Sequence, residues 1–432
     1  GDEQWWRALN HYLTKYAHQP VDTEQFRAAI EEATGQKLDW FFNEWVYKQG
    51  HPILRVTQKY DAPTQTLTLD VRQEQQPDPN SPYPQATFFR MPVDVEIGTA
   101  QGAHVERVQL APVADQSFTF KVDSAPLLVN FDYGRTLVKE LRFDKPTDNL
   151  LYQLAHDTDV LGRTWALGQL RTRLHQTQAD GAEQRRIADA VGAALVTDKF
   201  WGVRNEAARV LVGLPGEQVR ASLAAATKDQ NPQVRAQAIS ALGDSREPKL
   251  ADLYQQALGD ESYTVVSAAA EALGKTKQPT AYDALLKLLA APSWREKLQA
   301  AALSGLAETG DKRALELGLR YAGPEHSSDV RRAAVRLLGT VGRNDPRSLP
   351  VLLQTLRQCV ATSDIALGMM TAQAIYELDD EQGLQQLHSI LVFVNKLVTD
   401  ADLRAFTAQV EERLRQKQAP PPQKPAQKQS HK

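Results

Sequence analysis

The sequence predicts a multidomain chain with a short helical segment, an all-β sandwich and an α-solenoid of two-helix repeats. Apolar residues recur at helical spacing up to about residue 49, alternate with polar residues from Pro52 to Phe143, and return to helical spacing from Asp148 onwards. The last zone also repeats itself, mostly every 31 to 33 residues. At about 150 residues per domain, a length of 432 residues is consistent with roughly three domains.

Composition excludes several classes of protein. The hydrophobic fraction of 42% and the charged fraction of 24% are typical of a globular chain, and no apolar run is long enough to predict a membrane span. A net charge of -3 does not favour a nucleic-acid partner. The single cysteine, Cys359, excludes an internal disulfide framework and a Cys-based zinc site. Because the chain opens on Gly1 and not on Met, we interpret the start as a cut through a longer protein or a cloning remnant, and the localisation is not predicted.

Residues 1–50 predict three helices. Helical spacing of apolar residues places them at residues 3–16, from Asp22 or Thr23 to Gly35, and at residues 38–48. Four of the seven tryptophans fall in the first 45 residues. Three short helices cannot bury that much aromatic surface among themselves, so we expect them to pack on something else.

Residues 51–146 predict a β-sandwich. Apolar residues alternate with polar ones in at least three runs, which is typical of half-buried strands. The three runs are Leu67, Leu69 and Val71, then Phe89, Met91, Val93, Val95 and Ile97, and then Phe118, Phe120 and Val122. Prolines between residues 77 and 84 exclude a central strand there. Six or seven strands of this length fit a small sandwich.

Residues 147–415 predict a solenoid. Each unit ends on a leucine that follows an alanine by four residues and, in most units, an apolar residue by eight. The leucines are Leu170, Leu211, Leu242, Leu273, Leu306, Leu338 and Leu378, and the alanines are Ala166, Ala207, Ala238, Ala269, Ala302, Ala334 and Ala374. Positions i, i+4 and i+8 share one helix face, and the small residue between them indicates close contact with a neighbouring helix. Two short helices per unit therefore stack in series.

Charged residues accompany this pattern. Arginine stands seven residues before the leucine in several units, and an acid stands thirteen residues before it. The arginines are Arg163, Arg204, Arg235 and Arg331, and the acids are Asp157, Asp198, Asp229, Asp260 and Glu325. We expect each Asp to cap the second helix of its unit and each Arg to bridge to an adjacent repeat. The pattern resembles HEAT repeats, in which such residues form a buried ladder; Val266, Ser293 and Gln299 would interrupt it. The alternative is an arginine row that binds an acidic ligand.

The remaining sequence offers no complete catalytic site. Residues 416–432, with four Lys, four Pro and five Gln, are expected to be a disordered, solvated tail; the alternative is contact with an anionic surface. No two of the nine histidines are four apart, so a zinc-binding H-E-x-x-H helix is excluded. Cys359 is expected to be an unreactive thiol, and Asp379, Asp380 and Glu381 a solvated turn. No catalytic, cofactor-binding or metal-ligating residue is predicted in this chain.

A specific order of residues runs through the first 60 positions. It consists of Trp6, His11, Tyr12, Leu13, Thr23, Phe26, Phe41, Phe42, Trp45, Val46, Gly50 and Pro52, followed by the apolar residues Leu54 and Val56. This order resembles the end of the catalytic domain and the first sandwich strand of zinc aminopeptidases of the aminopeptidase N type. Residues 129–132 and 137–141 resemble the closing strands of that family's sandwich. The resemblance covers residues 1 to about 146 and implies that residues 1–50 are the last helices of a peptidase catalytic domain.

The resemblance carries implications for function. The family's zinc ligands, general-base glutamate and transition-state tyrosine precede this segment, so zinc is expected in an upstream domain and none of these residues can be assigned here. The full-length protein would remove N-terminal residues from peptides, while this chain, inactive alone, supplies a scaffold and helices that enclose the substrate. The implied partners are a peptide substrate and a possible protein on the repeats. The alternatives are a non-catalytic binding scaffold with a degenerate peptidase domain, and repeats that only stabilise the fold.

Overall fold

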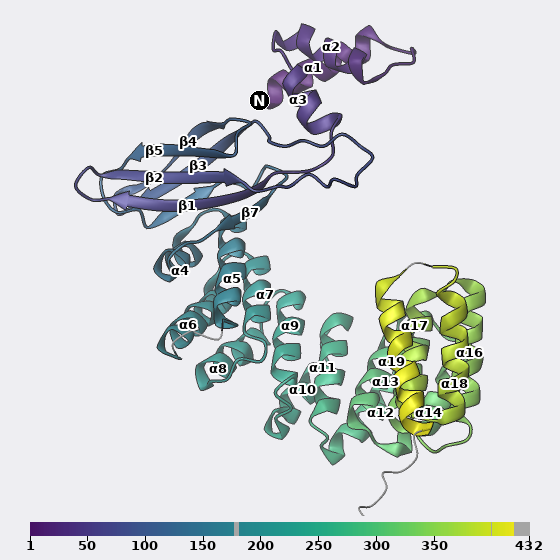
Figure 1. Cartoon of the computed structure of the whole chain (residues 1–432). Coiled ribbons are helices and arrows are strands. Elements are labelled where there is room, and N and C mark those ends of the chain that lie inside the picture. Colours follow the sequence, from purple (N-terminus) through teal and green to yellow (C-terminus); the bar gives the residue numbers. More distant parts are fainter. Residues whose placement is uncertain (177–180, 399, 419–432) are drawn as a thin grey trace, which may run out of the picture. The chain divides into compact units, whose positions relative to one another are not determined.

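The computed structural model describes residues 1–176, 181–398 and 400–418. The chain forms two compact units, Gly1–Ala190 and Val191–Lys432. The first contains the N-terminal helices, the sandwich and the start of the helical array, and the second contains the rest of the array (Figure 1). Among the described residues, no helix combines the length and the apolar character needed to span a membrane. The predicted fold class is confirmed, whereas the predicted domain boundaries stay a prediction.

The N-terminal helices are α1 (Asp2–Lys15), α2 (Thr23–Thr34), α3 (Asp39–Phe41) and the π-helical turn η1 (Phe42–Val46). Asp22 caps α2 by accepting hydrogen bonds from two backbone amides of the first turn, and Gly35 ends it in a left-handed conformation with φ 71°. The sequence signals for α2 are therefore confirmed. The third predicted helix is instead divided, because the backbone widens into a π turn, in which Tyr47 N donates to Phe42 O at 2.9 Å.

The aromatic residues of this segment pack unevenly. Trp45 lies against Phe89 of the sandwich core, with ring centroids 4.7 Å apart, and its Nε1 donates to Arg90 O at 3.4 Å. Trp5 and Trp6 remain 46% and 65% exposed. The expectation that these aromatics pack on something else is confirmed for Trp45, which anchors the helices on the sandwich.

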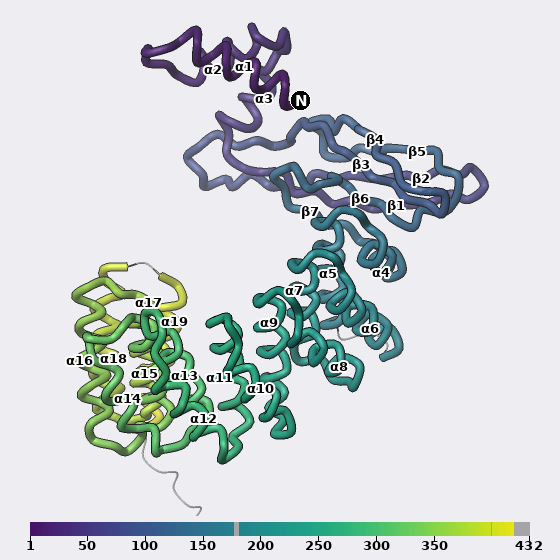
Figure 2. Tube along the Cα trace, turned by 180° about the vertical axis from the view of Figure 1, so that it is seen from behind, coloured from purple at the N-terminus to yellow at the C-terminus, as the bar shows by residue number. Residues whose placement is uncertain are grey.

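The sandwich consists of seven strands in two sheets (Figures 1 and 2). They are β1 (Ile53–Asp61), β2 (Thr66–Gln73), β3 (Met91–Thr99), β4 (Gly102–Leu110), β5 (Asp115–Lys121), β6 (Leu128–Phe131) and β7 (Glu140–Phe143). One sheet has the order β5-β2-β1-β7 and the other the order β4-β3-β6. The pairing of β1 with β7 is parallel, while the other named strand pairs are antiparallel. The alternating apolar residues fill the space between the two sheets.

The predicted start of the third strand is wrong. The predicted strand began at Phe89, but β3 begins at Met91. Phe89 is nevertheless fully buried, because the side-chain amide of Gln73 donates to Phe89 O and accepts from Phe89 N, both at 2.8 Å. A buried side chain thus satisfies backbone groups that a neighbouring strand would otherwise pair.

The helical array begins directly after the sandwich. Its elements are α4 (Thr147–His156), α5 (Val160–Leu174), α6 (Gly181–Thr197), α7 (Trp201–Val210), α8 (Glu217–Ala226), α9 (Pro232–Gly243), η2 (Pro248–Leu250), α10 (Ala251–Ala257), α11 (Tyr263–Lys275), α12 (Pro279–Ala290), η3 (Trp294–Glu296), α13 (Lys297–Thr309), η4 (Lys312–Ala314), α14 (Leu315–Tyr321), α15 (Ser328–Val341), α16 (Ser348–Thr362), α17 (Ile365–Leu378), α18 (Glu381–Val394) and α19 (Ala401–Gln418). In the second unit the second helices of successive pairs lie side by side (Figure 2). The repeated leucines and alanines are all buried, none more than 5% exposed, which confirms the stripe predicted from the sequence.

The charged ladder is confirmed in part, but the acids do not cap helices. Asp229 Oδ1 accepts from Asn231 N at 2.8 Å, and Asn231 is the N-cap of α9. Asp260 makes the same bond to Ser262 N at 2.9 Å, one position before α11. Each Asp therefore stabilises the turn that enters the helix and leaves the cap to a residue two positions later. Its other contacts come from the arginine of the preceding repeat.

Those arginines bridge adjacent repeats as predicted. Arg204 Nε lies 2.6 Å from Asp229 Oδ2, and Arg235 contacts both Asp260 oxygens at 2.9 Å. The side chains of these pairs are at most 16% exposed. In the fifth unit Gln299 replaces the arginine and donates to Ala291 O at 2.5 Å, so the interruption predicted there is confirmed.

The end of the array differs from the sequence expectation. α19 continues to Gln418, so residues 416–418 are helical although the sequence placed them in the tail. The remaining residues of the predicted tail, 419–432, lie outside the described residues.

Candidate functional site

Buried polar side chains meet where β6 and the end of β7 contact α4 and α5. Asn130, Lys145, Gln153 and Asp157 are 7%, 3%, 0% and 3% exposed, respectively. Burying such groups is unfavourable unless they bond to one another. In the first unit this cluster combines a perturbed titratable group with a cavity, the usual marks of a functional site.

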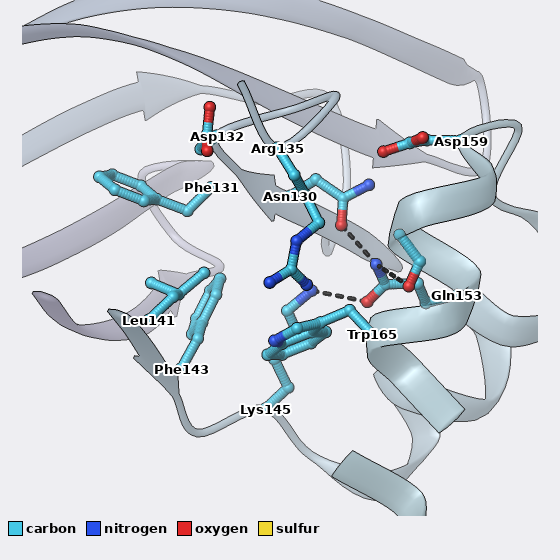
Figure 3. Close-up of a pocket in the computed structure, with 11 residues that line it drawn as sticks. Asn130, Phe131, Asp132, Arg135, Leu141, Phe143, Lys145, Gln153, Asp159 and Trp165 are labelled. Carbon is cyan, nitrogen blue, oxygen red and sulfur yellow. Dashed lines mark hydrogen bonds between the residues drawn. The ribbon is translucent and has the colours of Figure 1, made fainter. Parts of the chain in front are cut away.

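The four side chains form a chain of hydrogen bonds, of which Figure 3 shows the part from Lys145 through Gln153 to Asn130. Lys145 Nζ donates to Gln153 Oε1 at 2.7 Å, and Gln153 Nε2 donates to Asn130 Oδ1 at 2.5 Å. Asn130 Nδ2 donates to Asp157 Oδ2 and to Glu96 Oε2, both at 2.7 Å. Residues of β3, β6, the segment after β7 and α4 are therefore joined through one network.

Burial controls the electrostatics of the cluster. Desolvation lowers the pKa of Lys145 to about 7, although the charges of Asp157 and Glu96 act in the opposite direction. Its Nζ lies 4.9 Å from the ring centroid of Phe143 and 4.7 Å from that of Trp165, positions that favour a cation. Burial also raises the pKa of Glu96. The amine of Lys145 is thus much closer to neutrality than that of an exposed lysine.

The repeat pattern explains why Asp157 lies here. Asp157 is the ladder acid of the first unit, and its Oδ1 accepts from Asp159 N at 2.8 Å, as the later ladder acids do in their own turns. Its Oδ2 accepts from Asn130 of β6 and from Gln153 of α4, where the later acids bind an arginine. Gly162 of α5 makes room for this carboxylate, since a Cβ there would lie 2.1 Å from Asp157 Oδ2. The first repeat thus uses its ladder position to bind the sandwich.

A second buried group shapes the loop between β6 and β7. Asp132 adopts φ 62° and accepts hydrogen bonds from Thr136, Leu137 N and Lys139 Nζ. The side chains of Asp132 and Lys139 are 1% and 3% exposed. The prediction that residues 137–139 belong to a closing strand is therefore wrong, because Asp132 holds them in a loop and β7 begins only at Glu140.

The space beside Lys145 limits its chemistry. The cavity is about 20 Å³ and is lined by Lys145, Gln153 and Trp165 among others. That volume holds about one water molecule. A neutral amine could attack a carbonyl, but no carbonyl substrate fits beside this one. The geometry therefore supports a role in joining the sandwich to α4 and α5.

The residues considered for chemistry in the sequence analysis lie outside this cluster. Cys359 is buried in α16, and burial raises the pKa of its thiol, consistent with an unreactive group. Asp379 is not part of a solvated turn, because its carboxylate contacts Arg343 at 2.5 Å, Arg413 at 2.9 Å and Lys417 at 3.2 Å. Burial raises the pKa of Asp379, but Arg413 and Lys417 more than offset it, so the pKa lies below its usual value. Asp379 thus ties α19 to the end of α17.

Comparisons with known proteins agree with this architecture. Residues 50–132 match the family described as a domain of unknown function (DUF3458) with an Ig-like fold, and residues 219–303 and 290–360 match HEAT repeats. The chain is 22% identical over 227 residues to the puromycin-sensitive aminopeptidase of Caenorhabditis elegans, a match that covers 51% of this chain and 23% of that protein. It is 36% identical over 59 residues to aminopeptidase M1-D of Oryza sativa subsp. japonica, covering 14% of this chain and 7% of that one. The chain is similar to the C-terminal part of an aminopeptidase N-type protein.

Two further similarities qualify this relationship. Transcription initiation factor TFIID subunit 2 of Saccharomyces cerevisiae is 42% identical over 55 residues, which are 13% of this aminopeptidase-like chain and 4% of that protein. The crystal structure of Legionella pneumophila aminopeptidase A shares the fold, with a TM-score of 0.54 and 14% identity over 95% of this chain and 55% of that one. The matched part of the chain therefore spans less than a quarter of the length of each curated relative named here.

The possible metal ligands in the described part of this aminopeptidase-like chain are dispersed. Within residues 1–176, 181–398 and 400–418, no three His, Cys, Asp or Glu side chains come close enough together to hold a metal ion. Several histidines contact single carboxylates instead, among them His11 with Glu32 at 3.1 Å and His51 with Glu140 at 3.0 Å.

Proposed function

We propose that this chain is the C-terminal region of a zinc aminopeptidase-like protein, in which it supports a catalytic domain and helps to enclose a peptide substrate. The observation that carries the proposal is the match to a puromycin-sensitive aminopeptidase over 227 residues. A match of that length cannot fit within the N-terminal helices and the sandwich, which end at Phe143. It therefore includes part of the helical array, so the similarity is not confined to the N-terminal helices and the sandwich.

In this proposal the chain contributes structure and not catalysis. Trp45 anchors the N-terminal helices on the sandwich, and the Lys145 cluster holds the sandwich against α4 and α5. Zinc and the groups that act with it would belong to residues outside this chain, because in the family that the chain resembles they precede the segment found here. The full protein would then remove N-terminal residues from peptides.

The coding sequence upstream of Gly1 tests the proposal first. An H-E-x-x-H helix followed by a ligand glutamate is the zinc site that a peptidase of this kind requires. A protein that contains those residues together with this chain is expected to hydrolyse an aminoacyl-anilide and to lose that activity on chelation of zinc. This chain alone is expected to be inactive, and robust hydrolysis by it would contradict the proposal.

A non-catalytic scaffold is the second candidate. It is favoured by the 42% identity to a transcription initiation factor subunit over 55 residues, higher than the identity to either aminopeptidase named above. Stacked repeats offer extended surfaces that bind partners readily. An upstream sequence that has lost the zinc-binding histidines would favour the scaffold, and an intact set would favour the enzyme.

A further inference from the structure

The second unit contains a groove across the second helices of three successive repeats. Its volume is about 320 Å³, and its lining comes mainly from α11, α13 and α15. The central positions carry small side chains, which leave the helix surfaces hollow there. These residues are Ser267, Ala300, Ala301, Ser304 and Ala333. Charged side chains stand on both sides of this hollow.

One end of the groove carries an excess of positive charge. Lys297 Nζ lies 2.5 Å from Asp329 Oδ2, and Arg332 contacts the other oxygen of the same carboxylate. Two cations therefore share one anion, for a net charge of +1. The hydrogen bond from Lys297 lowers the pKa of Asp329, so this carboxylate stays ionised at neutral pH. The three side chains are 31% to 37% exposed and remain accessible to a ligand.

The other end carries the opposite charge. Arg336 contacts Glu271 at 3.6 Å and also contacts Glu308. One cation is here shared by two anions, for a net charge of -1. Arg336 follows Asp329 by seven residues on α15. At 1.5 Å per residue, the two ends are about 10 Å apart along the helix.

The helices themselves reinforce this polarity. Lys297 and Asp329 lie in the first turns of α13 and α15, whereas Glu308 lies in the last turn of α13. The contacts of Lys297 with Asp329 and of Arg336 with Glu308 show that α13 and α15 run in the same direction. Their dipoles are therefore positive at the Lys297 end and negative at the Glu308 end. Side chains and backbone create the same field along the groove.

We propose that this groove binds a short peptide with both termini free. Its α-carboxylate would lie against Lys297 and Arg332, and its α-ammonium against Glu271, the carboxylate that lines the other end of the groove. An extended chain advances about 3.3 to 3.6 Å per residue, so a peptide of about three residues spans the distance between the two ends. The small side chains between the ends leave room for its backbone. This binding belongs to the array itself and does not depend on the proposed peptidase activity.

Calorimetric titration of the chain with trialanine tests the proposal. We expect the free peptide to bind, and N-acetylation or C-amidation each to weaken binding about fivefold, as loss of one partly exposed charge contact does. Glu271→Gln should weaken binding of the free peptide and leave that of the acetylated peptide unchanged. Arg332→Gln should weaken binding of the free peptide and leave that of the amidated peptide unchanged. A variant that merely unfolds would not discriminate between blocked and free ends.

Glu316→Gln is the matched control, since Glu316 lies on α14, is 68% exposed and does not line the groove. It should bind all three peptides as the unchanged chain does. The proposal is overturned if free trialanine does not bind at about 10 mM, or if blocked and free peptides bind alike. Equal effects of Glu271→Gln on the free and the acetylated peptide would also overturn it. Because the readout is binding by this chain alone, its failure is distinguishable from failure of the proposed aminopeptidase function.

Discussion

Lys145 carries an amine into a site that has room for about one water molecule. The amine donates a hydrogen bond to the side-chain oxygen of Gln153, and the rings of Phe143 and Trp165 flank it. Desolvation outweighs the attraction of Asp157 and Glu96, so the pKa falls to about 7 from the usual 10.5. At neutral pH, folding therefore releases the proton of Lys145 in part of the molecules.

The variant Lys145→Met tests how this loss of a proton affects stability. Between about pH 7 and pH 10.5 the unfolded chain holds a proton on Lys145 that the folded chain has released. The free energy of unfolding of the first unit therefore rises with pH across this window, by up to about 1.4 kcal/mol per pH unit. The variant should lack this contribution. Urea unfolding followed by tryptophan fluorescence at several pH values between 7.5 and 9.5 measures the difference.

A surface lysine provides the control for that experiment. Lys37→Met removes an exposed amine and should leave the pH dependence of stability as it is in the unchanged chain. If the stability curves of Lys145→Met and of the unchanged chain run parallel from pH 7.5 to 9.5, the amine of Lys145 is charged in the folded state and the account of burial is wrong.

Two glycines of α5 differ in their surroundings: Gly162 lies close to a neighbouring side chain, and Gly168 does not. A Cβ at Gly162 would lie 2.1 Å from Asp157 Oδ2, whereas a Cβ at Gly168 would meet nothing within 4 Å. Asp157 is fixed by hydrogen bonds and cannot easily move. Gly162→Ala should therefore destabilise the first unit by about 1 to 3 kcal/mol, and Gly168→Ala should stabilise it by about 0.5 to 1 kcal/mol. Thermal unfolding of both variants measures these changes in stability. Equal effects would mean that Asp157 can move away from the added methyl group without loss of stability.

At the scale of elements, the ladder links one repeat to the next. Arg235 of α9 binds both oxygens of Asp260, and its Nη1 donates to Asp229 O at 2.8 Å. One side chain thus joins the turn of its own unit to the turn of the following unit. Bidentate pairs of this kind are stronger than single contacts.

A double-mutant cycle on Arg235 and Asp260 measures that link. Either Arg235→Met or Asp260→Asn should cost about 3 kcal/mol, because each leaves its partner without an opposite charge in a site at most 16% exposed. The double variant should cost less than the sum of the two. Denaturant unfolding followed by circular dichroism gives the three values. Arg209→Met serves as control, since its contact with Glu206 is 3.8 Å long and exposed, and should change stability by less than about 1 kcal/mol.

The contribution of the Arg235–Asp260 pair to stability depends on pH in a direction that follows from the pKa of Asp260. Burial raises the pKa of Asp260, but the hydrogen bonds from Arg235 and Ser262 N more than offset it, so the pKa lies below its usual value. Such a carboxylate stabilises the fold above its unfolded pKa of about 3.9, and the contribution is lost as the pH falls through the lower folded value. Asp260→Asn should therefore unfold with less dependence on acid; an unchanged acid dependence would exclude the pair as its source.

The sequence predicted the existence of elements better than the details of their ends. α2 could be placed from Asp22 and Gly35, because capping depends on local residue types. The ladder acids were wrongly predicted to cap the helices. The sequence does not distinguish an Asp at the cap from an Asp two residues before it. The π turn at Phe42–Val46 was not predicted, because the spacing of apolar residues does not distinguish it from an α-helical turn.

At the scale of the whole molecule, two compact units each have their own core. Five tryptophans lie in the first unit, and Trp201 and Trp294 lie in the second. Most helices belong to the second unit. Fluorescence therefore reports mainly on the first unit, and far-ultraviolet circular dichroism mainly on the second. Chains with separate cores depart from two-state unfolding.

We expect the two signals to give different midpoints in urea. The sandwich depends on pairings distant in sequence, while each repeat is stabilised by its neighbours, so the two units should respond differently. Superimposable transitions, fitted by one midpoint and one slope, would show that the chain unfolds as a single cooperative unit and would contradict this prediction.

The candidate site could not have been found from the sequence. Glu96, Asn130, Lys145 and Gln153 come from four separate stretches, and each is a residue type that is usually exposed. Only the fold brings them together. Asp157 was identified, but as a ladder acid, because the pattern cannot show that the first repeat has the sandwich as its neighbour.

The parallel pairing of β1 with β7 has a consequence for the timing of folding. Ile53 lies opposite Glu140 and Val56 opposite Phe143, so one edge of the first strand stays open until the last strand has been made. A ribosome adding about 5 to 20 residues per second needs roughly 4 to 17 seconds for the residues between them. During that interval the nascent sheet presents an unpaired edge of the kind that other chains can bind. Completion of the sheet in the cell therefore cannot precede translation of β7.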